Sequence, residues 1–134
     1  MDLQIHVDQI RNDADSRSQR VALAGRLDTH SFDELDRRLA PVLASDVRSL
    51  VLDLAGLEYI SSAGIRSIFK ARKALAARGG KVVVANVQPQ IQKVFDIVKA
   101  MPTTDIFASV AEADAYLDAM QQKVLRGDED ADDA

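Results

Sequence analysis

Two adjacent serines, Ser61 and Ser62, stand between an apolar run that ends near Leu54 and an amphipathic stretch that begins near Ser62. This junction is the carboxyl end of an expected strand, where α/β sheets commonly place their sites. A serine there caps the helix by accepting a backbone N–H. Alternatively, its hydroxyl is presented for phosphorylation, because free N–H groups and the helix dipole stabilise a phosphate. The residues alone leave both interpretations open.

The residues after the two serines are Ala63, Gly64 and, two positions later, Arg66. The two small residues leave room beside the hydroxyl for the active site of another protein. Arg66 is interpreted either as a solvated helix residue or as a cation that contacts acidic groups of a partner or a new phosphate.

Residue types needed for catalysis or metal binding are sparse. The chain has no cysteine and two histidines, His6 and His30, and neither is spaced with carboxylates as in a metal site. It also lacks the G-x-S-x-G elbow and the glycine-rich phosphate loops. We therefore expect no enzyme, no metal and no cofactor, with both histidines on the surface.

Charge is unevenly distributed along the 134 residues, whose net charge is −4. The last eight residues (127–134, GDEDADDA) hold five acids, and the rest of the chain holds 17 bases and 16 acids. A nearly neutral body does not favour direct nucleic-acid binding. We predict one domain over residues 1–126 and a disordered acidic tail over 127–134. Without a long apolar run or a signal peptide, we expect no membrane span and a cytoplasmic location.

Periodicity places these residues on alternating strands and helices. The expected fold is a single α/β domain, with an N-terminal hairpin, a mixed and mostly parallel sheet, and about four helices. The expected strands are 3–7, 20–24, 50–54, 82–85 and a short edge strand at 105–107. The expected helices begin near residues 32, 62, 89 and 110.

Several local details follow from the same patterns. Gly25 is expected to end the second strand, and Ser31 with Glu34 predicts a capping box at the first helix. The third and fourth expected strands are so apolar that we predict buried strands. Phe69 and Tyr116 are expected on the inner faces of the second and last helices.

Four segments, in order, resemble the STAS domain family of anti-sigma factor antagonists. The segment from Val51 to Arg66 (VLDLAGLEYISSAGIR) resembles the family signature. The other three similar segments are LAGRLD (23–28), GGKVVVANV (79–87) and the helix start at 89–95. The resemblance covers roughly residues 3–120 and implies a protein–protein switch in place of catalysis.

The resemblance also implies partners and roles. Such a protein binds an anti-sigma factor that is also a serine kinase of the histidine-kinase-like ATPase type. The kinase phosphorylates the antagonist and ends the complex, and a serine phosphatase reverses the step. Aligned on Gly64, the acceptor is Ser62, with Ser61 as the second choice. The implied partner-binding residues are Asp28, Thr29, Ser61, Ser62, Ala63, Gly64 and Arg66.

Two positions depart from the family pattern. Ser61 stands where phosphorylated members often have Asp, and Arg66 replaces a small residue. The first departure keeps an alternative open: a STAS scaffold subunit of a signalling or lipid-transport complex that is never phosphorylated. A small enzyme or nucleotide-binding module is a third alternative, which the missing motifs oppose.

Overall fold

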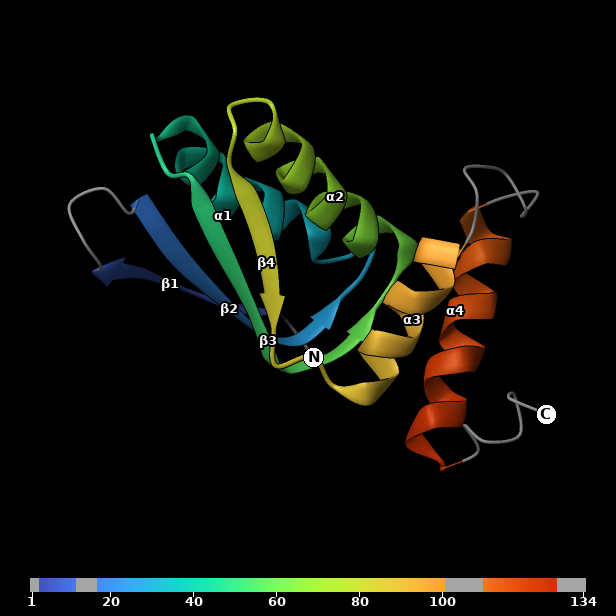
Figure 1. Ribbon diagram of the computed structural model, residues 1–134. Helices are drawn as coiled ribbons and strands as arrows, with labels where there is room; N and C mark the ends of the chain where they lie inside the picture. The colour runs from blue at the N-terminus through green and yellow to red at the C-terminus, as the bar shows by residue number, and fades with distance from the viewer. Residues whose placement is uncertain (1–2, 12–16, 101–109, 128–134) are drawn as a thin grey trace.

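Strands and helices alternate along the chain after an N-terminal hairpin (Figure 1). The computed structural model describes residues 3–11, 17–100 and 110–127. The elements are β1 (Gln4–Arg11), β2 (Arg17–Leu27), α1 (Phe32–Ala44), β3 (Ser49–Ile60), α2 (Ser62–Ala76), β4 (Lys81–Ala85), α3 (Pro89–Ala100) and α4 (Val110–Leu125). The expected strand at 105–107 and residues 128–134 of the acidic tail lie outside the described residues.

The four described strands form a mixed sheet in the order β1-β2-β3-β4. β1 pairs with β2 in antiparallel fashion, with Asp8 opposite Arg20, and the pairs β2–β3 and β3–β4 are parallel. Parallel neighbours need a crossover connection, and α1 and α2 supply the two crossovers. The predicted α/β class, the hairpin, the mostly parallel sheet and the four helices are confirmed.

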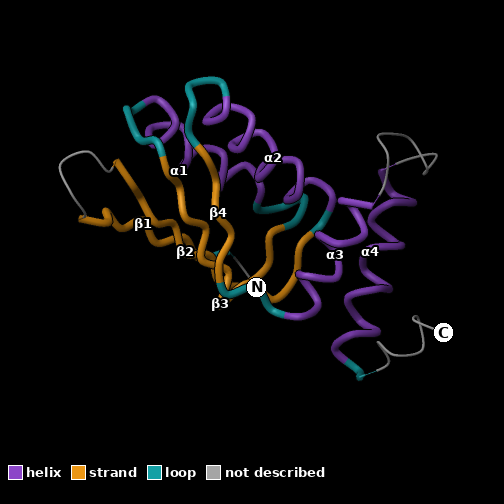
Figure 2. The backbone as a smooth tube through the Cα atoms, in the orientation of Figure 1, coloured by secondary structure: helices purple, strands orange, loops and turns teal. Residues whose placement is uncertain are grey.

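Helices α1 and α2 lie together on one face of the sheet, whereas α3 and α4 lie side by side near one end (Figure 2). Leu50, Leu52 and Leu54 of β3 alternate along the strand and are fully buried. They pack in one core with the apolar stripes of the helices, which include Leu39 of α1 and Leu75 of α2. Alternation sends the intervening β3 side chains to the opposite face. One apolar core therefore anchors the strands whose ends carry the predicted site residues.

Gly25 does not end β2, contrary to expectation. The strand continues to Leu27, and its register with β3 shifts between Gly25 and Arg26. Gly25 has φ of 97°, a value that glycine adopts without the steric penalty of a Cβ. The irregularity is absorbed as a local bulge. β2 therefore reaches as far as the end of β3, where Leu27 lies opposite Ile60.

Some residues predicted to be inward are exposed. Val83 of β4 is 40% exposed, and Phe69 of α2 and Tyr116 of α4 are each 41% exposed. The prediction that β4 is a buried strand is therefore wrong for the described residues. The physical reason is that β4 is an edge strand of the described sheet. Helices α1 and α2 lie on one face of the sheet, and Val83 points to the opposite face, which they leave open. On the same open face, Asp53 of the central strand β3 is nevertheless buried.

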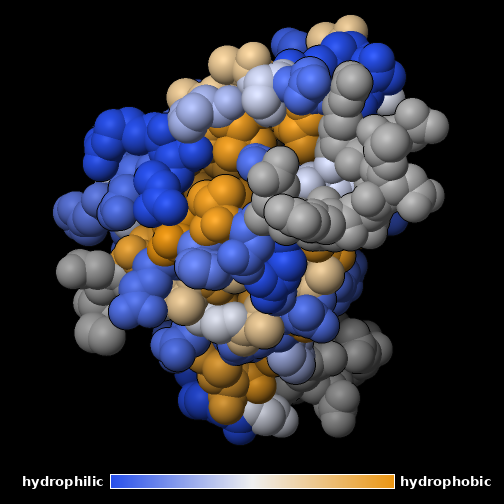
Figure 3. All heavy atoms as spheres, turned by 90° about the vertical axis from the view of Figure 1, so that its left-hand side faces the viewer, coloured by the Kyte–Doolittle hydropathy of each residue, from blue (hydrophilic) through white to orange (hydrophobic). Residues whose placement is uncertain are grey.

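The side of the molecule that carries the hairpin and α1 has an apolar centre framed by hydrophilic side chains (Figure 3). A shallow groove between the hairpin and the end of α1 is lined by Val7, Gln19, Arg38, Pro41, Val42 and Ser45. This groove lies far along the strands from the Ser61–Ser62 junction, at the opposite end of β2 and β3.

Candidate functional site at the start of α2

The two loops that carry the predicted site residues meet at the carboxyl ends of β2 and β3. The backbone N–H of Ser61 donates to the carbonyl of Leu27, with 2.9 Å between nitrogen and oxygen. This bond ties the start of α2 to the residue that precedes Asp28. The structure thus places the Asp28–Thr29 loop beside Ser61 and Ser62.

The Asp28 loop is held by its own polar groups. Asp28 Oδ1 accepts the backbone N–H of His30 at 2.9 Å, and the backbone N–H of Asp28 donates to Ser31 Oγ at 2.9 Å. The Ser31 hydroxyl donates to the carbonyl of Arg26 at 2.8 Å. Ser31 precedes α1 but makes no side-chain cap, so the predicted capping box with Glu34 is wrong. The loop uses this hydroxyl to fix Asp28 instead, and Thr29 and His30 are left exposed.

Asp28 is held as a carboxylate. Burial raises the pKa of Asp28, but the N–H of His30, the Ser31 hydroxyl and the Arg26 guanidinium outweigh burial and lower that pKa below its ordinary value. Arg26 Nε lies 3.5 Å from Asp28 Oδ2. A fixed negative charge therefore stands beside the start of α2.

Ser61 and Ser62 have different environments although they are neighbours. Ser61 is extended, with φ of −104° and ψ of 176°, and its hydroxyl accepts the Gly64 N–H at 3.4 Å. Ser61 is therefore the helix cap, and it is only 3% exposed. Ser62 is the first residue of α2, and its Oγ is closed off from solvent without a hydrogen-bond partner among the described residues. The cap and a free hydroxyl are both present, on separate residues.

The two small residues after the serines face the core. Ala63 is 6% exposed and Gly64 is buried. A Cβ built on Gly64 would lie 2.6 Å from Leu27 Cγ and 2.9 Å from Ile60 Cγ1. The space beside Gly64 is therefore filled by the Leu27 and Ile60 side chains of this chain. Arg66, by contrast, is exposed on α2.

Helix α4 covers the start of α2, which the sequence did not predict. Asp114 Oδ1 accepts the backbone N–H of Ser62 at 2.8 Å. Gln121, which is fully buried, accepts the Ile60 N–H at 3.0 Å and donates to the Ile60 carbonyl at 2.8 Å. The available signal was a glutamine in the apolar stripe that contains Leu117 and Met120.

Tyr59, near the end of β3, interacts with Arg26 of β2 and with carboxylates of α4. The Arg26 guanidinium lies over its ring, 3.9 Å from the centroid, a cation–π arrangement. Burial raises the pKa of the Tyr59 hydroxyl, the carboxylates of Asp118 and Asp114 raise it further, and Arg26 opposes them. Two α4 carboxylates therefore lie close to the end of β3.

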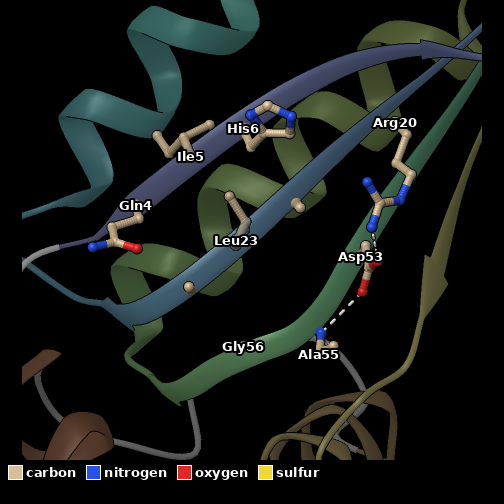
Figure 4. Close-up of a pocket in the computed structure, with 10 residues that line it drawn as sticks. Gln4, Ile5, His6, Arg20, Leu23, Asp53, Ala55 and Gly56 are labelled. Atoms are coloured by element: carbon tan, nitrogen blue, oxygen red, sulfur yellow. Dashed lines mark hydrogen bonds and ion pairs between the residues drawn. The ribbon is translucent and has the colours of Figure 1, made fainter.

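A second polar cluster lies on the open face of the sheet, where Arg20 and Asp53 point toward one another (Figure 4). Arg20 of β2 bridges Asp8 of β1, at 3.0 Å, and Asp53 of β3. Asp53 Oδ1 also accepts the Ala55 N–H at 3.0 Å and the Asn86 side chain at 3.1 Å. These two bonds, together with Arg20, outweigh burial and lower the pKa of Asp53.

This second cluster includes one of the two histidines. His6 Nε2 lies 2.8 Å from Asp8 Oδ1, and its side chain is 74% exposed. His30 is exposed as well, so the predicted surface placement of both is confirmed. Over residues 3–11, 17–100 and 110–127, no three histidine, cysteine or carboxylate side chains converge as metal ligands would. In those same ranges, no helix has the length and apolar character of a membrane span.

Comparison with known proteins identifies the class. The STAS domain family matches residues 14–113, well over half of the chain. The chain belongs to the STAS domain family. The mixed sheet and the four helices of the structure agree with this fold family.

Two relatives of this chain carry the names of anti-sigma factor antagonists. BtrV of Bordetella bronchiseptica is 35% identical over 77 residues, which cover 58% of this chain and 66% of that protein. The chain thus spans just under two thirds of the length of this relative. The anti-sigma-B factor antagonist of Bacillus subtilis is 28% identical over 106 residues, or 79% of this chain and 94% of that protein.

Among solved structures, the fold is similar to that of the anti-sigma factor antagonist SpoIIAA. Its unphosphorylated form superposes with a TM-score of 0.59 at 17% identity, covering 86% of this chain and 98% of that one. A phosphorylated form of the Bacillus protein gives a TM-score of 0.58 at 18% identity, covering 76% and 93%. At these identities the similarity shows the fold alone.

Proposed function

We propose that this protein is an anti-sigma factor antagonist, a regulatory protein that binds an anti-sigma factor and is switched off by phosphorylation of Ser62. The observation that supports the proposal is that the two serine hydroxyls have different environments. Ser61 is used as the helix cap, whereas Ser62 Oγ has no hydrogen-bond partner among the described residues. A phosphoryl acceptor needs a hydroxyl that the fold does not use.

The names of the relatives support the same function. One relative is an anti-sigma-B factor antagonist, and the similar fold of SpoIIAA occurs in a phosphorylated form. We propose a partner that is both anti-sigma factor and serine kinase, of the histidine-kinase-like ATPase type, in the cytoplasm. A serine phosphatase restores the hydroxyl. The chain itself performs no catalysis in this scheme.

The proposed contact surface is centred on the start of α2 and includes the exposed residues around it. Thr29 is exposed on the Asp28 loop and Arg66 on α2, whose first residue is Ser62. Ala63 and Gly64 face the core, so we propose for them a role in shaping α2 and not in touching the partner. Protein interfaces of standard size bury ~800 Å² per partner, enough to include the loop and the first turns of α2.

Electrostatics explains why phosphorylation would end the complex. A phosphate on Ser62 adds a charge of about −1.5 to −2 to the junction where the Ser61 N–H is bonded to Leu27, the residue before the ionised Asp28. Burying a mismatched charge in an interface commonly costs ~2–5 kcal/mol. That loss corresponds to about a 30-fold to several thousand-fold weaker complex, enough to reverse the choice of partner.

The experiment is a pull-down from lysate of the source cells with Ser62→Ala and Ser62→Asp baits, analysed by mass spectrometry. We expect the Ser62→Ala bait to retain a small ATPase-domain serine kinase and the Ser62→Asp bait to lose it. Ser45→Asp is the matched control, because Ser45 is exposed at the far end of α1 and adds the same charge away from the site.

Retention of the same partners by both Ser62 baits, with no kinase among them, would contradict the proposal. That result would favour the alternative of a STAS scaffold subunit that is not phosphorylated. Loss of the kinase from the Ser45→Asp bait as well would show that added charge, and not its position, weakens the complex.

A further inference from the structure

Helix α4 contacts the first turn of α2, where its Asp114 carboxylate is bonded to the backbone of Ser62. The first backbone N–H groups of a helix have no partner within the helix and attract anions. Here the Ser62 N–H is already taken by the Asp114 carboxylate at 2.8 Å. The α2 N-terminus thus holds an anion from its own chain.

A second residue, two turns further along the same face of α4, strengthens this contact. Gln121 makes both available hydrogen bonds to the backbone of Ile60, at 3.0 Å and 2.8 Å, and also donates to the Leu117 carbonyl at 3.2 Å. Gln121 is 0% exposed. Hydrogen bonds inside the protein are stronger than those in water, so this side chain fixes α4 over the end of β3.

Burial of the Ser62 hydroxyl opposes phosphorylation in this arrangement. Ser62 Oγ is closed off from solvent, whereas transfer from ATP requires an in-line approach to the hydroxyl oxygen. In that step, the Ser62 Oγ–P bond forms and the bond from the γ-phosphorus to the β–γ bridging oxygen breaks. The hydroxyl proton passes to a base of the kinase, and ADP leaves. No such approach exists while the oxygen is covered.

Charge opposes a phosphate after transfer as well. Asp114 sits on the Ser62 N–H, and both Asp114 and Asp118 are close enough to Tyr59 to raise the pKa of its hydroxyl. A phosphate of charge about −2 would face these carboxylates at short range. Like charges placed together are destabilising, and the phosphate would compete with Asp114 for the same N–H.

We propose that the docking of α4 and the phosphorylation of Ser62 are mutually exclusive. α4 is a cap that shields the hydroxyl; once it moves, the phosphate replaces Asp114 at the α2 N-terminus and keeps α4 displaced. This inference rests on the proposed phosphorylation of Ser62, and it adds a regulatory step: the partner kinase acts only on the form with α4 displaced.

The shielding half of the proposal is tested with a single thiol. The chain has no cysteine, so Ser62→Cys introduces one, and Thr29→Cys gives an exposed reference on the neighbouring loop. The measured quantity is the rate of alkylation by iodoacetamide in the full chain. We expect Cys at 62 to react far more slowly than Cys at 29, and equal rates would overturn the proposal.

A variant that weakens the contact of α4 with β3 tests whether α4 is the element that shields the side chain at position 62. Gln121→Leu removes the Ile60 bonds without changing charge, so it leaves the electrostatic environment of the thiolate intact. We expect it to speed alkylation at position 62 by about tenfold to a hundredfold, the range for losing such hydrogen bonds, with no change at position 29. An unchanged rate at 62 would overturn the proposal.

A second variant covers the case in which Gln121→Leu disturbs the fold. Asp114→Asn removes the anion, and rates are compared at a pH where the thiol is fully ionised, so that a shifted thiol pKa does not enter. We again expect faster alkylation at 62. Asp33→Asn is the matched control, because Asp33 is exposed on α1, and it should leave the rate at 62 unchanged.

The exclusion half is tested by amide hydrogen exchange of Ile60, whose N–H is bonded to Gln121. We expect Ser62→Asp to speed this exchange by at least tenfold and Ser45→Asp to leave it unchanged. Exchange at the wild-type rate in Ser62→Asp would overturn the proposal. None of these measurements uses a kinase, so an absent kinase would defeat the proposed function without altering the alkylation and exchange results.

Discussion

The two polar clusters of this domain are built from the same kinds of side chain but are satisfied differently. On the open face of the sheet, Asp53 is held by Ala55, Asn86 and Arg20, all within the sheet or next to its strands. At the start of α2, the Ser62 hydroxyl has no partner among the described residues, and its N–H is held by a helix far along the chain. From this difference we infer a structural role for Asp53, whose carboxylate is fully bonded, and we propose the switch at Ser62, whose hydroxyl is not bonded in the described structure.

The comparison predicts that Asp53 affects stability and not switching. Asp53→Ala leaves the Ala55 N–H and the Arg20 guanidinium without their carboxylate. Losing hydrogen bonds to a buried carboxylate lowers the free energy of unfolding by about 2–3 kcal/mol, as measured by urea unfolding at pH 7. Alkylation of Cys at position 62 should not change.

The same variant has a defined pH dependence. The folded-state pKa of Asp53 lies below the ordinary value of 3.8, so its ionised form contributes stability above that pH. The contribution is lost as the pH falls through the lower, folded-state pKa. The difference between wild type and Asp53→Ala is therefore largest near pH 7 and shrinks below about pH 4. A difference that is the same at pH 7 and pH 3 would assign the effect to packing instead.

Gly64→Ala tests whether the site's small residues serve packing. The added Cβ would lie 2.6 Å from Leu27 Cγ, and overpacking of this kind costs about 1–3 kcal/mol. The gain in helix propensity offsets up to about 1 kcal/mol of it. We expect a lower midpoint of thermal unfolding, with Ala74→Gly, at an exposed position of the same helix, as the control for propensity. An unchanged midpoint in Gly64→Ala would show that Leu27 moves aside without cost.

The smallest expected effects on stability come from replacing each of the two serines by alanine, and they should differ between the two positions. Ser61→Ala removes the helix cap and lowers the free energy of unfolding by about 1 kcal/mol. Ser62→Ala removes a buried hydroxyl that has no partner in the described structure, so stability stays equal or rises slightly. Chemical denaturation of the two variants side by side measures the difference. A larger loss in Ser62→Ala than in Ser61→Ala would reverse the assigned roles.

Much of the fold was predictable because it depends on local patterns. Apolar alternation and helical spacing located the hairpin, the parallel strands and the four helices, with bounds extended by several residues in β2 and β3. The predictions that were wrong concern neighbours: Gly25 continues a strand because β3 pairs with it, and Phe69 is exposed because nothing described covers it.

The sequence by itself determined the order of the elements, the placement of two serines at a helix start and, through resemblance, the family. The choice of Ser62 as the acceptor stays a prediction of that resemblance. Spacing could not choose between the serines, because either hydroxyl can cap. Only the tertiary structure decided that Ser61 is the cap and that α4 covers Ser62. Asp114 lies 52 positions from Ser62, and Gln121 lies 61 from Ile60. Periodicity records which face of a helix is apolar, whereas partners so distant along the chain are set only by how the helices pack.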